Sequence, residues 1–260
     1  MTSRGYTSLL RNLTSNQPPP GPLHIPRLCE DCATVFGLDG TSILIESAGG
    51  GTAGLSTWGD ATAELESQQF VLGEGPGIAA QSSRRPEFVP DTGCDDRFPL
   101  FAAAAAAVGF GAAFAFPLGV GLIRLGVLSM YRTNPGDLDE RDFGDGVLVA
   151  DIVTALLLAE QAAQPGTDLP LAMEDPSSHR AVVHQATGMV SVQLGCGLDE
   201  ALVRIRAHAF ATGAPLDDVA RRIVERTLRL EPDVTSPVDG DVPPVEGDPP
   251  PIEGEEPDDG

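Results

Sequence analysis

Three successive amphipathic patterns with helical spacing occupy the C-terminal part of this chain. In the first, apolar residues recur at steps of three and four: Val183, Ala186, Val190 and Leu194. The second extends from Leu198 to Gly213 and the third follows Pro215. Each helix is too short to be stable alone in water, so the three must bury their apolar stripes together. The pattern predicts an all-α three-helix bundle within residues 165–230.

Residues 23–164 show a different pattern, in which short alternating strands are separated by helices. The alternation predicts strands at 42–46, 53–58, 87–90, 112–117 and 124–131. A long helical pattern from 138 to 164 closes this part, and its apolar seam is broad. The order predicts an α+β domain. The seam has two interpretations: it packs on the sheet of its own domain, or part of it pairs with a second copy of the chain.

An uncharged segment from 101 to 123 is long enough to be considered as a membrane span. Its alanines are only weakly hydrophobic, and several glycines and Pro117 interrupt it. We therefore expect a helix that ends at Gly109, followed by the strand that begins at Ala112. Residues 1–22 have arginines and a proline-rich run but no apolar core, which predicts a flexible N-terminus without a signal peptide.

The last thirty residues repeat a Pro-Val/Ile-acid-Gly unit every seven residues. Proline, glycine and like charges prevent a packed core, so residues 231–260 are predicted to be a disordered acidic tail. The plain interpretation is a solubilising tail. The alternative is that its carboxylates compete with an anionic partner for the arginines of the helical bundle.

Charge is distributed unevenly along the 260 residues, whose formal net charge is −22. The chain has no lysine, and seven of its sixteen arginines lie in 177–230, against five acidic residues there. This is the only segment that is not acidic. Because an anionic partner needs positive charge only at the contact surface, the bundle is the expected surface for nucleic acid.

The four cysteines, Cys29, Cys32, Cys94 and Cys196, are too few and too scattered for a disulfide-stapled secreted protein, so a cytoplasmic location is expected. Cys29 and Cys32 have CxxC spacing, but a zinc site needs a second pair or nearby histidines. Two cysteines on one helix are favoured, and neither a metal nor another cofactor is expected. The sequence shows no Ser/His/Asp arrangement, and we assign it no catalysis.

The bundle resembles a known family at several short motifs. These are Arg180, the run 184–189 (His-Gln-Ala-Thr-Gly-Met), 199–202 (Asp-Glu-Ala-Leu), 205–207 (Ile-Arg-Ala) and 216–220 (Leu-Asp-Asp-Val-Ala). Together they resemble an ANTAR domain, whose members bind RNA and act as transcription antiterminators. The family signature has a lysine where this chain has Thr187. The resemblance implies a hairpin RNA of a leader transcript as the partner.

The resemblance and the helical wheel together give eight candidate RNA-binding residues: Arg180, His184, Gln185, Thr187, Arg204, Arg206, Arg221 and Arg222. Arg206 lies beside the apolar stripe of its helix, so a mixed structural and RNA-contacting role is expected. Arg221 and Arg222 have the alternative of pairing with nearby acids. Gly188 is expected to allow a neighbouring helix to approach. We count the arginines, and no aromatic residue, as the groups that stack on RNA bases.

The α+β part resembles a GAF domain of the type that precedes ANTAR domains in actinobacteria. The resemblance rests on 38–42 (Leu-Asp-Gly-Thr-Ser), 73–77 (Gly-Glu-Gly-Pro-Gly), 97–99 (Arg-Phe-Pro) and 125–128 (Leu-Gly-Val-Leu). It implies an antiparallel sheet between helices, a cavity for an unknown small-molecule ligand, and a homodimeric regulator that is not embedded in a membrane. Two alternatives stay open: a ligand sensor whose helices only contact proteins, and a DNA-binding regulator.

Overall fold

The structure is a computed structural model in which residues 25–46, 52–163 and 178–231 are described. The predicted N-terminal segment 1–22 lies outside these residues, as does the predicted tail apart from Glu231. The described residues up to Leu230 belong to one compact unit. Contacts between its sheet part and its helical part are therefore contacts within this unit.

The unit contains a five-stranded antiparallel sheet. Its strands are β1 (Gly40–Glu46), β2 (Thr52–Trp58), β3 (Glu87–Val89), β4 (Ala112–Val120) and β5 (Ile123–Arg132), in the order β2-β1-β5-β4-β3. The five predicted strands are all present. β4 and β5 extend beyond the predicted ends because their hairpin stays paired out to Val120 and Ile123, which are exposed and give no burial signal.

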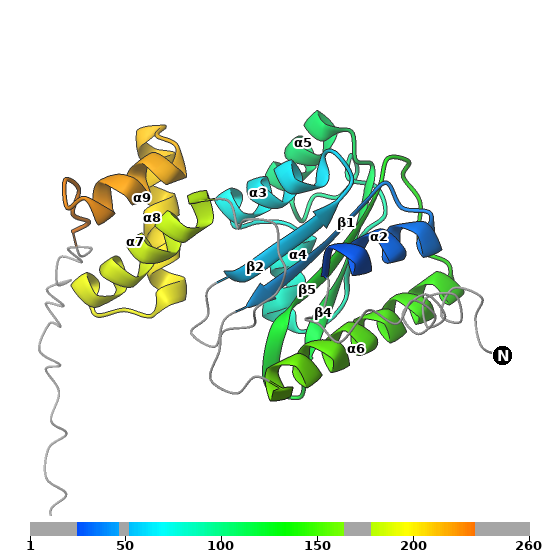
Figure 1. Ribbon diagram of the computed structural model, residues 1–260. Coiled ribbons are helices and arrows are strands. Elements are labelled where there is room, and N and C mark those ends of the chain that lie inside the picture. The colour runs from blue at the N-terminus through cyan, green and yellow to red at the C-terminus, as the bar shows by residue number, and fades with distance from the viewer. Residues whose placement is uncertain (1–24, 47–51, 164–177, 232–260) are drawn as a thin grey trace, which may run out of the picture. The chain divides into compact units, whose positions relative to one another are not determined.

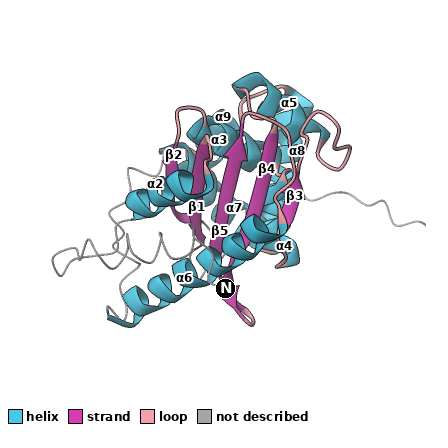
Figure 2. Cartoon of the chain, turned by 90° about the vertical axis from the view of Figure 1, so that its right-hand side faces the viewer, coloured by secondary structure: helices cyan, strands magenta, loops and turns pink. Residues whose placement is uncertain are grey.

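Helices cover both faces of the sheet (Figures 1 and 2). One face carries α2 (Ile25–Phe36) and α6 (Glu140–Ala163), and the other carries α3 (Thr62–Leu72), α4 (Pro76–Ser83) and α5 (Pro99–Val108). Ile43, Phe116 and Val153 are buried on the first face, and Leu65, Phe101 and Tyr131 on the second. Each buried side chain of this size contributes roughly 1.5–3 kcal/mol. The arrangement is an antiparallel sheet between helices, the α+β class predicted from the sequence.

The long helix α6 places its inward residues on the sheet. Val149, Val153 and Leu157 are buried in the same cluster as the strands, while Leu148 is 42% exposed. The seam is therefore used at least partly inside its own domain, as the first interpretation expected. The uncharged segment divides as predicted into α5, which ends at a left-handed Gly109, and β4. Among the described helices, none has the length and apolarity needed to cross a membrane.

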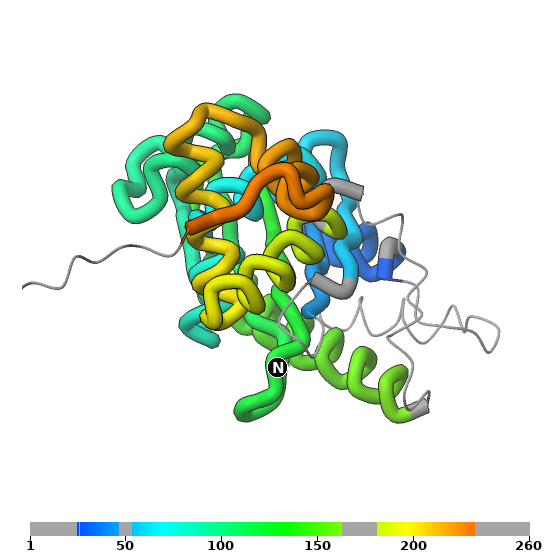
Figure 3. Tube along the Cα trace, turned by 90° about the vertical axis from the view of Figure 1, so that its left-hand side faces the viewer, coloured from blue at the N-terminus to red at the C-terminus, as the bar shows by residue number. Residues whose placement is uncertain are grey.

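The helical block consists of α7 (Ser178–Leu194), α8 (Leu198–Thr212) and α9 (Leu216–Val224), drawn yellow to orange in Figure 3. Val183, Val190, Ile205, Val219 and Ile223 form its buried core. Gly197 begins α8 without a side-chain cap, and Gly213 ends it in the left-handed conformation. The predicted three-helix block is confirmed.

One expectation for this block is wrong. A Cβ atom built on Gly188 meets nothing within 4 Å among the described residues, so this glycine does not serve a close helix approach. It lies beside an open cleft instead.

Candidate functional site

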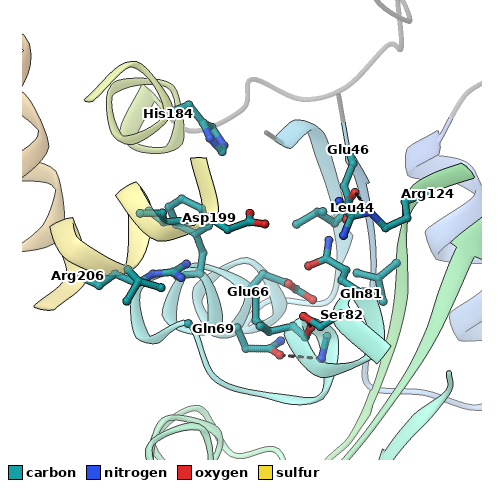
Figure 4. Close-up of a pocket in the computed structure, with 17 residues that line it drawn as sticks. Leu44, Glu46, Glu66, Gln69, Gln81, Ser82, Arg124, His184, Asp199 and Arg206 are labelled. Atoms are coloured by element: carbon teal, nitrogen blue, oxygen red, sulfur yellow. Dashed lines mark hydrogen bonds and ion pairs between the residues drawn. The ribbon is translucent and has the colours of Figure 1, made fainter. Parts of the chain in front are cut away.

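A cavity of about 370 Å³ lies where α3, α4 and the strands meet α7 and α8, and we call it the α3–α8 cavity (Figure 4). Figure 4 shows polar side chains of the sheet domain and of the helical block directed into this cavity. The strands contribute Leu44, Glu46, Arg124 and Val127; α3, α4 and the loop between them contribute Glu66, Gln69, Phe70, Gly73, Gly77, Ile78, Gln81 and Ser82; the helical block contributes His184, Asp199, Leu202, Val203 and Arg206. Two predicted RNA-binding residues, His184 and Arg206, thus line a cavity that they share with the sheet domain.

Arg206 is held against the C-terminal end of α3. Its Nη2 donates a hydrogen bond to the carbonyl oxygen of Phe70, and its Cζ lies 5.4 Å from the centre of the Phe70 ring. A Cβ on Gly73 would come within 2.7 Å of Arg206 Nη1, which shows how closely the guanidinium packs. The last carbonyls of a helix lack partners within it and attract cations. Arg206 therefore caps α3 across the contact, a role that one-dimensional periodicity cannot reveal.

A buried hydrogen-bond network lies at the sheet side of the cavity. Tyr131 Oη donates to Glu66 Oε1 at 2.6 Å, and Ser42 Oγ donates to the same oxygen. Gln69 Nε2 donates to Tyr131 Oη at 2.8 Å, while Gln69 Oε1 accepts from the amide of Gly77 at 3.1 Å. Burial, and then the Glu66 carboxylate, raise the pKa of the Tyr131 phenol, so it stays a proton donor. The glycine-rich loop at 73–77 thus supplies a backbone donor to this network.

Opposite charges meet at the rim of the cavity. Glu46 Oε2 lies 3.7 Å from Arg124 Nε. Burial raises the pKa of the Glu46 carboxyl; Arg124 opposes this, and the negative charge of Asp199 on α8 adds to it. The charge of Asp199 on the helical block thus affects the pKa of Glu46 on the sheet domain.

The other predicted RNA-binding residues lie in several environments. Thr187 is buried, and its hydroxyl donates to the carbonyl of Val183 at 2.8 Å, so it stabilises α7 from within. Arg204 pairs with Glu200 at 2.9 Å, and Arg221 pairs with Asp218 at 3.2 Å. Arg222 is exposed on α9, and the side chain of Arg180 lies outside the described residues. The eight candidates therefore do not gather into one surface.

An open cleft of about 670 Å³ lies between α7 and the segment that follows α9, and we call it the α7–α9 cleft. Its lining consists of Gln185, Gly188, Met189, Val192, Gln193, Ile223, Arg226, Leu228 and Arg229. Of the eight candidates only Gln185 is here, but two exposed arginines outside that set, Arg226 and Arg229, join it. No ion pair engages either arginine within the described part of the chain.

Arg226 has a backbone conformation that arginine rarely adopts. Its φ is +61°, and its amide donates to the carbonyl of Ile223 at 3.0 Å where α9 ends. The left-handed region costs a residue with a Cβ atom about 1–2 kcal/mol, and glycine is usual at this position. Strained residues cluster at functional sites, which makes Arg226 a candidate contact residue.

The expectation that the block offers no aromatic group needs correction. Phe210 on α8 is 85% exposed. Its ring is available for stacking on an unpaired base, which is how proteins commonly hold single-stranded RNA. The residue is visible in the sequence, three residues before Gly213 and off the buried stripe of Ile205 and Ala209.

The buried pair Cys29 and Cys32 on α2 gives a test of the cysteine interpretation. Burial raises the pKa of Cys29 to about 12 and that of Cys32 further, whereas Cys94 is exposed. Asp91 raises the pKa of Cys94 as well, but this thiol is exposed to the reagent, so iodoacetamide is expected to modify Cys94 in the native protein and to spare both buried thiols. Peptide mass spectrometry with and without guanidinium measures this. Equal alkylation of Cys29 in both conditions would contradict it.

Within the described residues, no group of three or more histidine, cysteine or acidic side chains has an arrangement suited to a metal ion. Cys29 and Cys32 are buried in the apolar cluster between α2 and the sheet, and Cys29 Sγ donates to the carbonyl of Ser56 at 3.5 Å.

One family model matches part of the chain. The model of the ANTAR domain matches residues 172–224, which contain all of α7, α8 and α9. No curated protein sequence matches the chain.

Three solved structures are similar to the chain. The GAF domain of an Acinetobacter phosphoenolpyruvate-protein phosphotransferase has 13% identity and a TM-score of 0.46, covering 63% of this chain and 98% of that one. The corresponding Coxiella burnetii GAF domain has 17% identity and a TM-score of 0.45, covering 62% and 98%. Free methionine-R-sulfoxide reductase from Neisseria meningitidis has 15% identity and a TM-score of 0.42, covering 54% and 78%.

Proposed function

We propose that this protein is a signal-responsive regulator that binds hairpin RNA and acts by transcription antitermination in the cytoplasm. The observation that carries the proposal is the ANTAR match over the whole helical block. Antitermination needs no covalent chemistry, because bound RNA hairpins exclude the terminator stem by stabilising another fold. In this proposal residues 23–164 form the sensor domain and residues 165–230 the RNA-binding domain.

The α7–α9 cleft supports this function with suitable chemistry. It places the amide of Gln185 and the guanidinium groups of Arg226 and Arg229 around an apolar floor. Amides read base edges, arginines contact phosphates or stack on bases, and apolar surface accommodates a splayed base. The exposed ring of Phe210 adds a second stacking group on α8. These are features of single-stranded loop recognition more than of duplex readout.

The sheet domain is proposed to be the sensor, with a small molecule in the α3–α8 cavity. Its volume of about 370 Å³ lies in the range of small-ligand sites. Arg206 and His184 reach this cavity from the helical block, and the rings of His184 and Phe70 lie 5.7 Å apart. A ligand there touches both parts of the protein. The active form is proposed to be a homodimer in which the outer side of α6, including Leu148, contributes to the contact.

A binding titration tests the proposed function. Full-length protein is titrated against an RNA with two small hairpin loops, a scrambled RNA and duplex DNA at several salt concentrations, and light scattering gives its oligomeric state. We expect preference for the hairpin RNA and weaker binding at higher salt, because phosphate contacts release counterions. Equal affinity for duplex DNA would favour a DNA-binding regulator. Binding to none of the three would favour a block that contacts only proteins.

A further inference from the structure

The guanidinium of Arg206 is a largely buried cation without a carboxylate partner among the described residues. It is held by the carbonyl of Phe70 and the ring of the same residue. Its Nε is buried and has no hydrogen-bond partner. Burial lowers the pKa of Arg206 to about 10, and no acidic neighbour offsets that effect. A buried charge that is not paired costs several kcal/mol, so this position favours any anion that reaches it.

Two of the three acidic residues that line the same cavity have other partners, and the third, Asp199, lies away from Arg206 along α8. Glu46 is paired with Arg124, and Glu66 accepts hydrogen bonds from Ser42 and Tyr131. Asp199 lies seven positions before Arg206 on α8, which places it two turns away, about 10 Å along the helix. The cavity therefore separates its charges: the acids lie at the strand side and at the start of α8, and Arg206 lies beside the end of α3.

The rest of the cavity wall suits an uncharged body. Leu44, Ile78, Val127, Leu202 and Val203 supply apolar surface, while the amide of Gln81 and the hydroxyl of Ser82 supply neutral polar groups. Ligand sites of this kind combine an apolar lining with a few polar groups that fix orientation.

We propose that the α3–α8 cavity binds a small organic anion, a single carboxylate or phosphate group on a compact uncharged body, with Arg206 as the residue that pairs with the anionic group. The guanidinium has five donors, of which Nη2 is used by Phe70, so pairing proceeds when it turns from the α3 carbonyl toward the cavity. The proposal rests on the sensor role of this cavity but not on RNA binding. In this proposal Arg206, a residue of the helical block, binds a ligand that otherwise contacts the sheet domain.

The coupling follows from the position of Arg206. An anion that takes over the guanidinium weakens its contact with the Phe70 carbonyl, and the anion thereby changes how α8 is held against α3. Because a ligand shifts an equilibrium only by its different affinity for two states, the exchange of one partner for another supplies that difference.

The test uses three probes with the full-length protein: benzoate, the uncharged analogue benzyl alcohol, and inorganic phosphate. Calorimetry and thermal unfolding are measured for the wild type, Arg206→Gln, Arg206→Lys and Arg141→Gln. We expect benzoate to bind and stabilise the wild type, and its affinity to fall about tenfold in Arg206→Gln but less in Arg206→Lys, which keeps the charge. The control Arg141→Gln removes one positive charge from α6, at a residue that does not line the cavity. We expect it to leave the benzoate affinity unchanged.

Several outcomes would overturn the proposal. They are equal affinity for benzoate and benzyl alcohol, unchanged benzoate binding in Arg206→Gln, and equal losses in the Gln and Lys variants, which would point to the α3 contact alone. The proposal would also be overturned if neither benzoate nor phosphate bound at concentrations up to about 10 mM. Such a result would mean a binding free energy of less than about 3 kcal/mol. Circular dichroism checks that each variant is folded. Since no RNA is present, these results are independent of whether the protein is an antiterminator.

Discussion

Replacing Gly126 by alanine is expected to destabilise the sheet domain strongly. Gly126 lies in β5 with φ at +152°, and a Cβ atom there would lie 1.8 Å from the carbonyl oxygen of Leu44 on β1. That oxygen belongs to the backbone of the neighbouring strand, so relief requires breaking the pairing of β1 with β5. We expect a loss of at least about 3 kcal/mol in the free energy of unfolding, measured by urea titration with circular dichroism.

Gly121 provides the matched control. Its φ is +58°, but a Cβ atom there meets nothing within 4 Å among the described residues. Gly121→Ala therefore has only the cost of the left-handed backbone, about 1–2 kcal/mol. Equal losses in the two variants would show that the contact with Leu44 is not decisive.

The second large effect is expected at the α7–α9 cleft. Changing Arg226 to glycine together with Arg229 to alanine removes two exposed cations from its lining. Charge-assisted contacts to phosphate are each worth about 1.5–3 kcal/mol, so hairpin RNA affinity at low salt is expected to fall by at least about a hundredfold. The slope of log affinity against log salt concentration is expected to become shallower as well.

Glycine at position 226 separates binding from stability. Because Arg226 is in the left-handed region, Arg226→Gly relieves strain, and the stability of the block is expected to stay equal or rise by up to about 1 kcal/mol. Arg141→Ala, on α6, controls for loss of charge. If RNA affinity were unchanged in the double variant, the cleft would not be the RNA-binding surface, and the face of Phe210 would be examined next.

The periodicity of the chain was sufficient for most of the fold. Short apolar runs bounded by turn residues identified the five strands, although β1 and β5 are buried along most of their length, and three-and-four spacing identified the helical block. The same three-and-four spacing also predicts the burial of Thr187, one of the candidate site residues. It lies four residues after Val183 and three before Val190, both buried, so the helical stripe already places it inside. The family motif has a lysine at the position of Thr187 and indicates an RNA contact instead.

The contacts that define the candidate sites were beyond periodicity. The helical wheel placed Arg206 next to the apolar stripe of α8, but it cannot show that its partner is Phe70, far away in the sequence. The position of the Arg226 side chain could not be predicted for a different reason. The chain leaves the helix at Glu225, so side-chain direction no longer follows the wheel. Long-range packing and irregular backbone are the two properties that local pattern does not encode.

The strand order has a consequence for synthesis on the ribosome. Gly40 on β1 pairs with Tyr131 on β5, the central strand, so the centre of the sheet closes only after residues up to 131 have emerged. Until then β1 and β2 form an isolated hairpin, which is at best marginally stable. The three helices of the block have only short-range connections and form quickly once made. Folding of the sheet domain is thus the slow step, and a pause in translation after α6 has emerged would favour its completion before the helical block is added.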